Sequence, residues 1–284
     1  LKEMMKYDNG ILHAATAFGK TVVCSAMIAE KKVNTLILLE ASALLEQWKT
    51  ALEQFLDIRE ELPEYKTKTG RTKVRKCLIG KLQGAHDSMT GIIDIAMAGS
   101  LRKKGEWHPL LQEYGMVIVD ECHHAASDTL TNVLQEVKAR YVYGVTATPK
   151  RSDGLEKVND MLLGPIRYSY TAKEKAKAQG IAHLVYPRFT RTVAPRGAAD
   201  KMHPNEAYEL VRNNEMRNEQ ILADIKECIA AGRTPVVLSK YKDHSEKLYE
   251  RIKSCADKVF LMTGNNSKKE HREIRQQMQL VSPE

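Results

Sequence analysis

Ala14-Ala15-Thr16-Ala17-Phe18-Gly19-Lys20-Thr21 follows a short apolar run, residues 10–13, and opens a segment of helical composition. A loop between a strand and a helix aims backbone N–H groups and the positive end of the helix dipole at one point, which favours a bound phosphate. In such a loop Lys20 reaches the terminal phosphates of a nucleotide, and Thr21 offers a hydroxyl to Mg²⁺. The stretch therefore predicts an α/β fold whose phosphate cradle consists of Ala15, Thr16, Ala17, Phe18, Gly19, Lys20 and Thr21.

Four further apolar runs recur between helical patterns, at residues 35–39, 92–96, 116–120 and 141–146. Nearly continuous apolar strands that alternate with helices are typical of a parallel sheet covered on both faces. Residues 42–55 place their apolar side chains on one helical face, as a crossover helix does. We therefore expect a doubly wound domain whose ligand site lies beyond the carboxyl ends of the strands.

Length and charge narrow the class of protein. The chain has 284 residues, which at roughly 150 residues per domain suggests about two domains. Its net charge of +8 favours a polyanionic partner, and nucleic acid is preferred to a membrane because no apolar run approaches the roughly 18 residues of a membrane span. The first residues lack a signal peptide pattern, and the 5 cysteines form no CxxC pair. A cytoplasmic protein is expected.

The domain organisation is predicted in three parts. Residues 1–165 carry the α/β pattern, and residues 166–204 are interpreted as a linker with one possible extended strand at 184–193. Residues 205–284 begin a second α/β unit with a long helix over 205–231, strands at 235–239 and 258–263, and a helix near 244–254. This unit has few strands and the chain starts with Leu1, so we expect a fragment of a longer protein.

A second motif, Met116-Val117-Ile118-Val119-Asp120-Glu121-Cys122-His123-His124, is an apolar strand that ends in two carboxylates. Asp120 can hold Mg²⁺ through its water shell, and Glu121 can orient and deprotonate a water that attacks the γ phosphate. A metal cluster or a solvated turn formed by Cys122, His123 and His124 is the alternative. Adjacent side chains at a strand end diverge, which disfavours a shared zinc ion.

The third motif, Val145-Thr146-Ala147-Thr148-Pro149-Lys150-Arg151-Ser152-Asp153-Gly154, would by itself be a polar turn. Three motifs at the ends of three predicted strands, in this order, resemble superfamily 2 DExH-box helicases and translocases. The Asp120-Glu121-Cys122-His123 tetrad is most similar to the branch that contains type III restriction motors and XPB-type helicases. Residues 38–48, 95–101, 236–244 and 263–264 resemble further motifs of that group, so the resemblance spans essentially the whole chain.

The resemblance implies two RecA-like domains that hydrolyse ATP with Mg²⁺ between them and move along DNA or RNA, with DNA favoured. Catalysis would rest on Lys20, Asp120, Glu121 and His123, with Thr21 and Asp120 at the metal, while His123, Thr146, Ala147 and Thr148 would couple the nucleotide to the grip on the strand. Bacterial defence by restriction-modification, with a nuclease or other domain on the flanks, is the pathway suggested by analogy.

The sequence also departs from the group. Ala14 and Ala17 stand where Gly is usual or frequent in the phosphate loop, no upstream Gln motif is present, and neither motif V nor the arginine-bearing motif VI follows. We therefore expect this chain alone to hydrolyse ATP slowly and not to unwind duplexes, since an arginine finger contributes roughly 10³ to 10⁵ in rate. An ATPase switch without motor activity and a catalytically dead nucleic-acid scaffold stay open as alternatives.

A basic run lies between residues 66 and 81, and it comprises Lys66, Lys68, Arg71, Lys73, Arg75, Lys76 and Lys81. It is either a solvated face or, beside the motifs at 38–48 and 95–101, a contact for the phosphates of the tracked strand. The candidate nucleic-acid contacts are Gln47, Lys73, Arg75, Ser100 and Lys240. Trp48 lies on the apolar face of its helix and is predicted to be core, whereas Trp107 could stack on a base.

Overall fold

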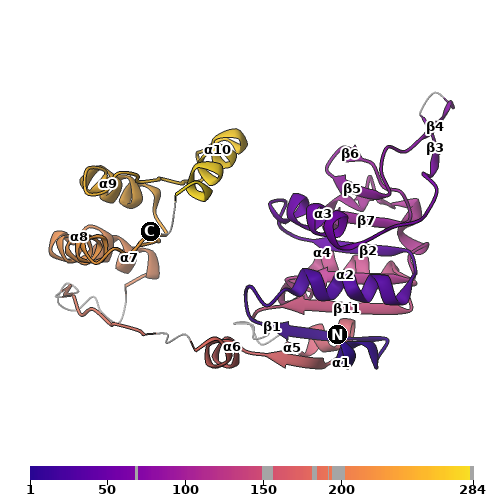
Figure 1. Cartoon of the computed structure of the whole chain (residues 1–284), viewed down its shortest axis with the longest axis horizontal. Coiled ribbons are helices and arrows are strands. Elements are labelled where there is room, and N and C mark those ends of the chain that lie inside the picture. The colour runs from indigo at the N-terminus through magenta and orange to yellow at the C-terminus, as the bar shows by residue number, and fades with distance from the viewer. Residues whose placement is uncertain (68–69, 149–155, 181–183, 191, 194–201, 282–284) are drawn as a thin grey trace. The chain divides into compact units, whose positions relative to one another are not determined.

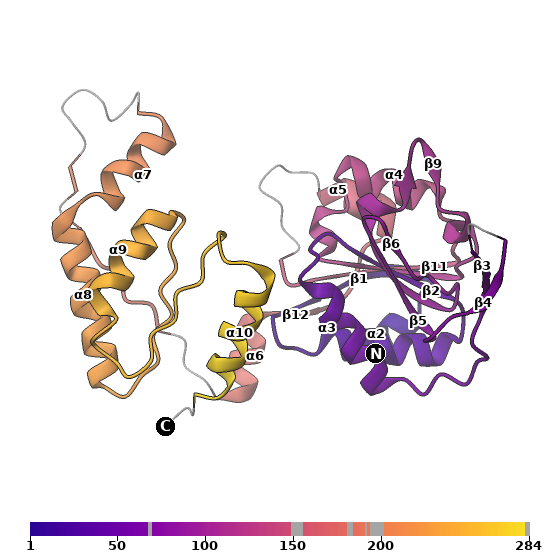
Figure 2. The ribbon, with the colours of Figure 1, turned by 90° about the horizontal axis from the view of Figure 1, so that it is seen from above.

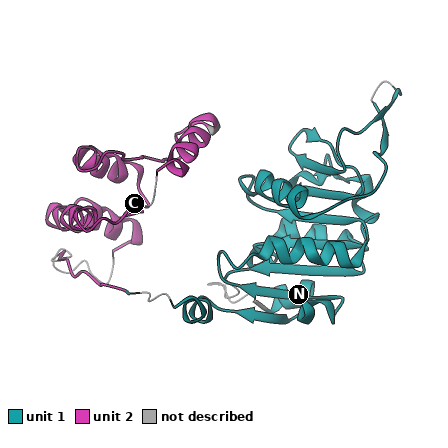
Figure 3. Ribbon diagram, viewed as in Figure 1, with its two compact units in different colours: residues 1–184 teal, residues 185–284 magenta. Residues whose placement is uncertain are grey.

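The computed structural model describes residues 1–67, 70–148, 156–180, 184–190, 192–193 and 202–281. These residues form two compact units, 1–184 and 185–284 (Figure 3). Each unit is described separately. None of the described helices combines the length and apolarity that a bilayer crossing requires.

Unit 1 is built on an eight-stranded sheet, and the predicted α/β fold with a parallel sheet is confirmed (Figure 1). All neighbouring strands run parallel except the last pair, which is antiparallel. In spatial order the strands are β12 (Ile166–Tyr170), β1 (Asn9–Ala14), β11 (Tyr141–Thr146), β10 (Met116–Asp120), β2 (Thr35–Leu39), β7 (Ile93–Met97), β5 (Ile79–Gln83) and β6 (His86–Asp87).

Helices cover both faces of the sheet (Figure 2). On one face α2 (Lys20–Lys31) and α3 (Leu44–Phe55) bury side chains against alternate residues of the strands. The other alternate residues pack against α4 (Asp128–Glu136) and α5 (Glu156–Leu163). Both sets of strand side chains are buried because the strands are apolar throughout, as in a parallel sheet between two helical layers.

The smaller elements of unit 1 lie at its ends and in its connections. They are α1 (Lys2–Met5), the 3₁₀ turns η1 (Ala98–Ser100), η2 (Pro109–Gln112) and η3 (Cys122–His124), and the hairpins β3 (Glu64–Lys66) with β4 (Thr72–Val74) and β8 (Arg102–Lys103) with β9 (Glu106–Trp107).

The predicted linker over 166–204 is wrong at its start. Residues 166–170 form β12, which extends the sheet beside β1. The following helix, α6 (Ala172–Gln179), begins with a capping box between Thr171 and Glu174 and ends at Gly180. The strand is half exposed at the edge of the sheet, so its side chains lack the continuous apolar run by which the inner strands were recognised.

Unit 2 is helical where it has regular structure, with α7 (Pro204–Arg212), α8 (Glu215–Ala230), α9 (Lys242–Ile252) and α10 (Lys268–Gln279). The single helix predicted over 205–231 is in fact two, because Asn214 accepts a hydrogen bond from the backbone N–H of Arg217 and caps α8. The strands predicted at 235–239 and 258–263 form no ladder with any described residue, and neither does the described part of 184–193. A strand needs a hydrogen-bonded neighbour, which the described part of unit 2 does not supply.

Candidate nucleotide site

The phosphate loop connects β1 to α2, as predicted. Lys20 is the first residue of α2, and Gly19 precedes it in a left-handed conformation with φ of 92°. A hydrogen bond of 3.1 Å from the N–H of Phe18 to the carbonyl of Ala15 closes the turn. Ala17 also has a positive φ of 58°, a conformation that glycine adopts more readily than alanine. This backbone costs an alanine roughly 1 kcal/mol.

Two carboxylates stand at the tip of β10. Asp120 is only 8% exposed and accepts hydrogen bonds from the indole Nε1 of Trp48 at 2.7 Å and from the N–H of Glu121 at 2.9 Å. Burial raises the pKa of Asp120, and the hydrogen bond from Trp48 opposes that rise. Glu121 has a φ of 47°, so the backbone turns sharply directly after the strand.

The loop and the strand tip meet at an ion pair. Nζ of Lys20 lies 3.6 Å from Oε1 of Glu121, so the structure brings together three of the predicted catalytic residues, Lys20, Asp120 and Glu121. Each Asp120 oxygen accepts one hydrogen bond from the protein and retains a lone pair. Oxygen donors such as Asp120 and the hydroxyl of Thr21 are those that Mg²⁺ prefers, so the residues fit this ion.

The third motif joins the same site through hydrogen bonds. Nδ1 of His123 lies 3.0 Å from Oγ1 of Thr146 and 3.3 Å from Oε2 of Glu121. The N–H of Thr148 donates to Oγ1 of Thr146 at 3.1 Å, and Ala147 lies between the two threonines. The rest of that motif, Pro149 to Gly154, lies outside the described residues. Three strands thus contribute polar groups at one edge of the sheet.

Sequence reasoning missed two supports of this network. Trp48 is buried as predicted, but the pattern gave no sign that its indole would reach Asp120. The amide of Asn159, on α5, donates to the carbonyl of His123 at 3.4 Å from a buried position. The only sequence signals for these roles are that Trp48 carries an N–H group on an otherwise apolar helix face and that Asn159 is a polar residue within a helix.

The cysteine and the two histidines that follow Glu121 do not form a shared metal site. Cys122 is buried, and a Cβ built on Gly144 would lie only 2.7 Å from its sulfur. His124 is directed instead to Glu40, with 3.9 Å between Nδ1 and Oε2. Within the ranges that the structure describes, no three His, Cys, Asp or Glu side chains are arranged to hold a metal ion.

The candidate nucleic-acid residues fall in separate places. Gln47, on α3, and Ser100, on η1, follow the carboxyl ends of β2 and β7. Lys73 and Arg75 belong to the β3–β4 hairpin and its continuation, which are inserted between the end of α3 and the start of β5, hence at the amino ends of the strands. The expectation that the whole basic run lies beside the other two motifs is therefore wrong. Lys81, the last residue of the basic run, forms an ion pair with Glu46 at 2.8 Å. Its charge is therefore partly neutralised within the protein.

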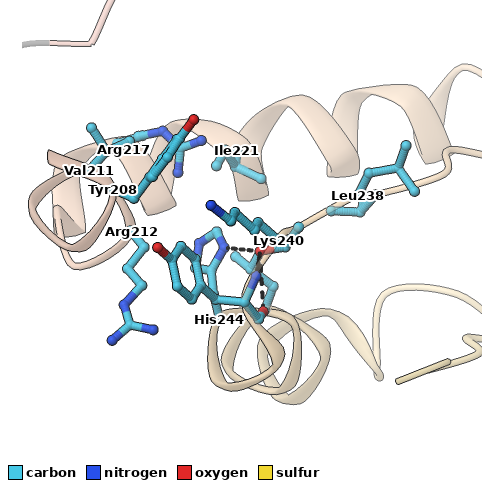
Figure 4. Close-up of a pocket in the computed structure, with 12 residues that line it drawn as sticks. Tyr208, Val211, Arg212, Arg217, Ile221, Leu238, Lys240 and His244 are labelled. Atoms are coloured by element: carbon cyan, nitrogen blue, oxygen red, sulfur yellow. Dashed lines mark hydrogen bonds between the residues drawn. The ribbon is translucent and has the colours of Figure 1, made fainter. Parts of the chain in front are cut away.

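Lys240 lines a pocket of unit 2, of about 180 Å³, between α7, α8 and the start of α9 (Figure 4). Its ammonium lies 4.3 Å from the centre of the Tyr208 ring. Beneath it, His244 lies between Ser239, at 2.9 Å from Nδ1, and Asn218, at 3.0 Å from Nε2. The pocket is rich in cations and its described lining contains no carboxylate.

Comparison with known proteins gives consistent matches. The family described as "Type III restriction enzyme, res subunit" matches residues 2–151. The DNA 3'-5' translocase XPB2 of Sulfurisphaera tokodaii is 30% identical over 176 residues, which cover 62% of this chain and 35% of that protein. The DNA 3'-5' helicase XPB of Kineococcus radiotolerans is 26% identical over 252 residues, 86% of this chain and 42% of that protein. The chain thus spans less than half the length of these relatives.

A solved structure, that of S. cerevisiae Dbp5 bound to RNA and ADP BeF3, has a similar fold. Its TM-score is 0.55 at 12% sequence identity, and the alignment covers 94% of this chain and 62% of that one. At this identity the likeness concerns the fold alone.

Proposed function

Because the chain belongs to the family of type III restriction enzyme res subunits, we propose that it is part of a motor that hydrolyses ATP and uses the energy to move along nucleic acid. The relatives that support this proposal are named as a DNA translocase and a DNA helicase. Their names also favour DNA over RNA as the partner.

One observation carries the assignment. The ion pair between Lys20 and Glu121 brings the phosphate loop beside the β10 carboxylates, and this supports the proposal because phosphoryl transfer uses a phosphate-binding lysine and a carboxylate at one site. When ATP enters, Lys20 exchanges the carboxylate for the β and γ phosphates. Glu121 is then free to accept a hydrogen bond from the attacking water, orient it in line with the γ phosphate, and take up its proton.

Thr21 and Asp120 would hold Mg²⁺, whose contribution is to neutralise charge that develops on the phosphate oxygens. The burial of Asp120 keeps bulk water from screening its charge, and the hydrogen bond from Trp48 orients the carboxylate. The hydrogen bond also favours the ionised carboxylate, against the effect of burial, which favours the protonated form.

The contacts of His123 offer a route from hydrolysis to movement. His123 lies within hydrogen-bond or ion-pair distance of both Glu121 and Thr146. A change at Glu121 when the γ phosphate leaves therefore alters the partners of His123 and, through Thr146, the loop of Ala147 and Thr148. We propose that these residues transmit the nucleotide state to the grip on the strand.

For the nucleic acid we propose two kinds of contact. Gln47 and Ser100, at the carboxyl ends of their strands, would contact the tracked strand, as would Lys240 in unit 2. Lys73 and Arg75 would contact phosphates elsewhere on the surface, because their hairpin lies at the other end of the strands. Slow hydrolysis by this chain alone, an associated nuclease or other domain, a role in restriction-modification and a cytoplasmic location stay predictions.

The test is the rate of ATP hydrolysis by the 284-residue chain with and without duplex DNA or RNA. We expect a slow rate that DNA raises and that falls to background in Lys20→Ala and in Glu121→Gln, while Lys138→Ala, an exposed lysine on another surface, retains it. Hydrolysis without stimulation by either nucleic acid would support an ATPase switch. Nucleic-acid binding without ATP binding would support the scaffold instead.

A further inference from the structure

The phosphate loop is held from outside by the segment β12–α6, which lies beyond the residues that the family match covers. The N–H of Ala15 donates to the carbonyl of Tyr170 at 2.9 Å, and the rings of Phe18 and Tyr170 lie 5.0 Å apart. From the first turn of α6, Nζ of Lys175 donates to the carbonyl of Thr16 at 2.8 Å. These three contacts, here called the loop clamp, hold the loop to residues far along the chain.

The contact of Lys175 determines the direction of a peptide group. The chain contains no cis peptide bond among its described residues, so the carbonyl of Thr16 and the N–H of Ala17 point in opposite directions. With the carbonyl turned toward Lys175, the N–H of Ala17 is directed away from α6. No described residue accepts a backbone hydrogen bond from that N–H. Among the described residues it is therefore a free donor, within a loop whose chemistry requires free donors.

This orientation needs support because Ala17 adopts the left-handed conformation without the freedom of glycine. The ammonium of Lys175 can supply it, since a hydrogen bond from a charged donor is roughly twice as strong as a neutral one. Lys175 has no carboxylate partner in the described part of the chain. Its ammonium group donates instead to the carbonyl of Thr16. The capping box of Thr171 and Glu174 anchors the turn of α6 that carries it.

We propose that Lys175 is a positioning residue for nucleotide binding, which holds the Thr16–Ala17 peptide so that the N–H of Ala17 faces the phosphates. The inference rests on the proposed function, since it assigns a role within the same ATP site. It adds a residue from outside the three motifs, and it explains how a loop with alanine at position 17 keeps a phosphate-binding form.

The experiment compares Lys175→Met with Lys175→Arg and with Lys173→Met, an exposed lysine on the same helix that serves as the matched control. Binding of a fluorescent ATP analogue to the 284-residue chain is titrated with Mg²⁺ present. We expect the Kd of Lys175→Met to rise about five- to tenfold, the arginine variant to stay within about twofold of the parent, and the control to be unchanged. The midpoint of thermal unfolding should be the same in all four proteins, because Lys175 lies at the surface.

A second readout is independent of nucleotide. Hydrogen exchange at the amides of residues 15–18 is measured in the free protein, where the clamp predicts faster exchange in Lys175→Met and parent-like exchange in Lys173→Met. Equal Kd values and equal exchange in all variants would overturn the clamp. If the parent itself bound no ATP analogue, the proposed function would fail, while the exchange comparison would still decide whether Lys175 holds the loop.

Discussion

The indole N–H of Trp48 donates a hydrogen bond of 2.7 Å to Oδ2 of Asp120, across the boundary between a helix and the central sheet. Trp48 is almost fully buried, so its ring fills the core while its one polar atom reaches the edge of the nucleotide site. Trp48 therefore both packs in the core of unit 1 and donates a hydrogen bond to the carboxylate of Asp120. A change that spares the packing can still alter the chemistry.

Trp48→Phe keeps an aromatic ring in the core and removes the donor. Because the hydrogen bond from Trp48 lowers the pKa of Asp120 against the effect of burial, its loss raises that pKa further. We expect the acidic limb of the pH profile of ATP hydrolysis to move to higher pH, and the free energy of unfolding to fall by about 2 kcal/mol. Trp107→Phe is the matched control, since Trp107 contacts Arg102 and not the site. Equal shifts in both variants would contradict the role of the indole.

Ala17→Gly tests the strain in the phosphate loop. Glycine adopts the φ of 58° without cost, and this gain exceeds the entropy that glycine adds to the unfolded chain. We expect the free energy of unfolding to rise by about 0.5 kcal/mol, with ATP binding retained. Ala26→Gly, within α2, should lower it by about 1 kcal/mol. Urea unfolding measures both, and a loss of stability in Ala17→Gly would show that the loop is not strained at this residue.

The parts of the site that could be predicted from sequence are those in which one short stretch carries both the fold and the chemistry. The geometry of the Lys20 loop and of the strand that ends at Asp120 and Glu121 can be predicted from the local sequence, because an apolar strand followed by polar residues must end at the edge of a sheet. The support of Asp120 by Trp48 and of Thr16 by Lys175 joins residues 72 and 159 positions apart. No local pattern encodes such a pairing.

The same reasoning explains the errors in the fold. β12 is an edge strand whose half-exposed side chains lack an apolar run, and only its ladder with β1 identifies it. The apolar residues 235–239 have strand composition, but composition cannot supply a neighbour, and the described residues of unit 2 offer none. The sequence predicted that the basic run and the motif that contains Ser100 lie on one surface. The path of the chain instead places Lys73 and Ser100 at opposite ends of the strands.

A substitution in the β3–β4 hairpin tests whether the surface that carries Lys73 binds nucleic acid. Lys73 is exposed and has no ion pair with any described residue, and Arg75 stacks at 4.1 Å over the Tyr65 ring. If Lys73 neutralises a phosphate, Lys73→Ala should weaken duplex binding similarly for all sequences and reduce the slope of log K against log salt by about 0.9. Fluorescence anisotropy across a salt series measures the slope. An unchanged slope in Lys73→Ala, equal to that of Lys138→Ala, would show a solvated face.

A final prediction concerns acid stability, which is independent of ATP. The hydrogen bond between Asp87 and His108, at 3.1 Å, holds the pKa of Asp87 at about 2. Since this pKa lies below the value of roughly 3.9 in an unfolded chain, the stabilisation is complete above about pH 5 and is lost as the pH falls through 2. Allowing for the exposure of Asp87, it amounts to about 1 kcal/mol.

Asp87→Asn should therefore lower the free energy of unfolding near pH 6 and converge with the parent near pH 2, whereas Asp257→Asn, at an exposed position, should follow the parent at every pH. Both tryptophans, Trp48 and Trp107, lie in unit 1 with Asp87, so their fluorescence during urea unfolding reports the unit concerned. A constant difference between Asp87→Asn and the parent from pH 6 to pH 2 would mean that Asp87 stabilises the fold through packing and not through its charge.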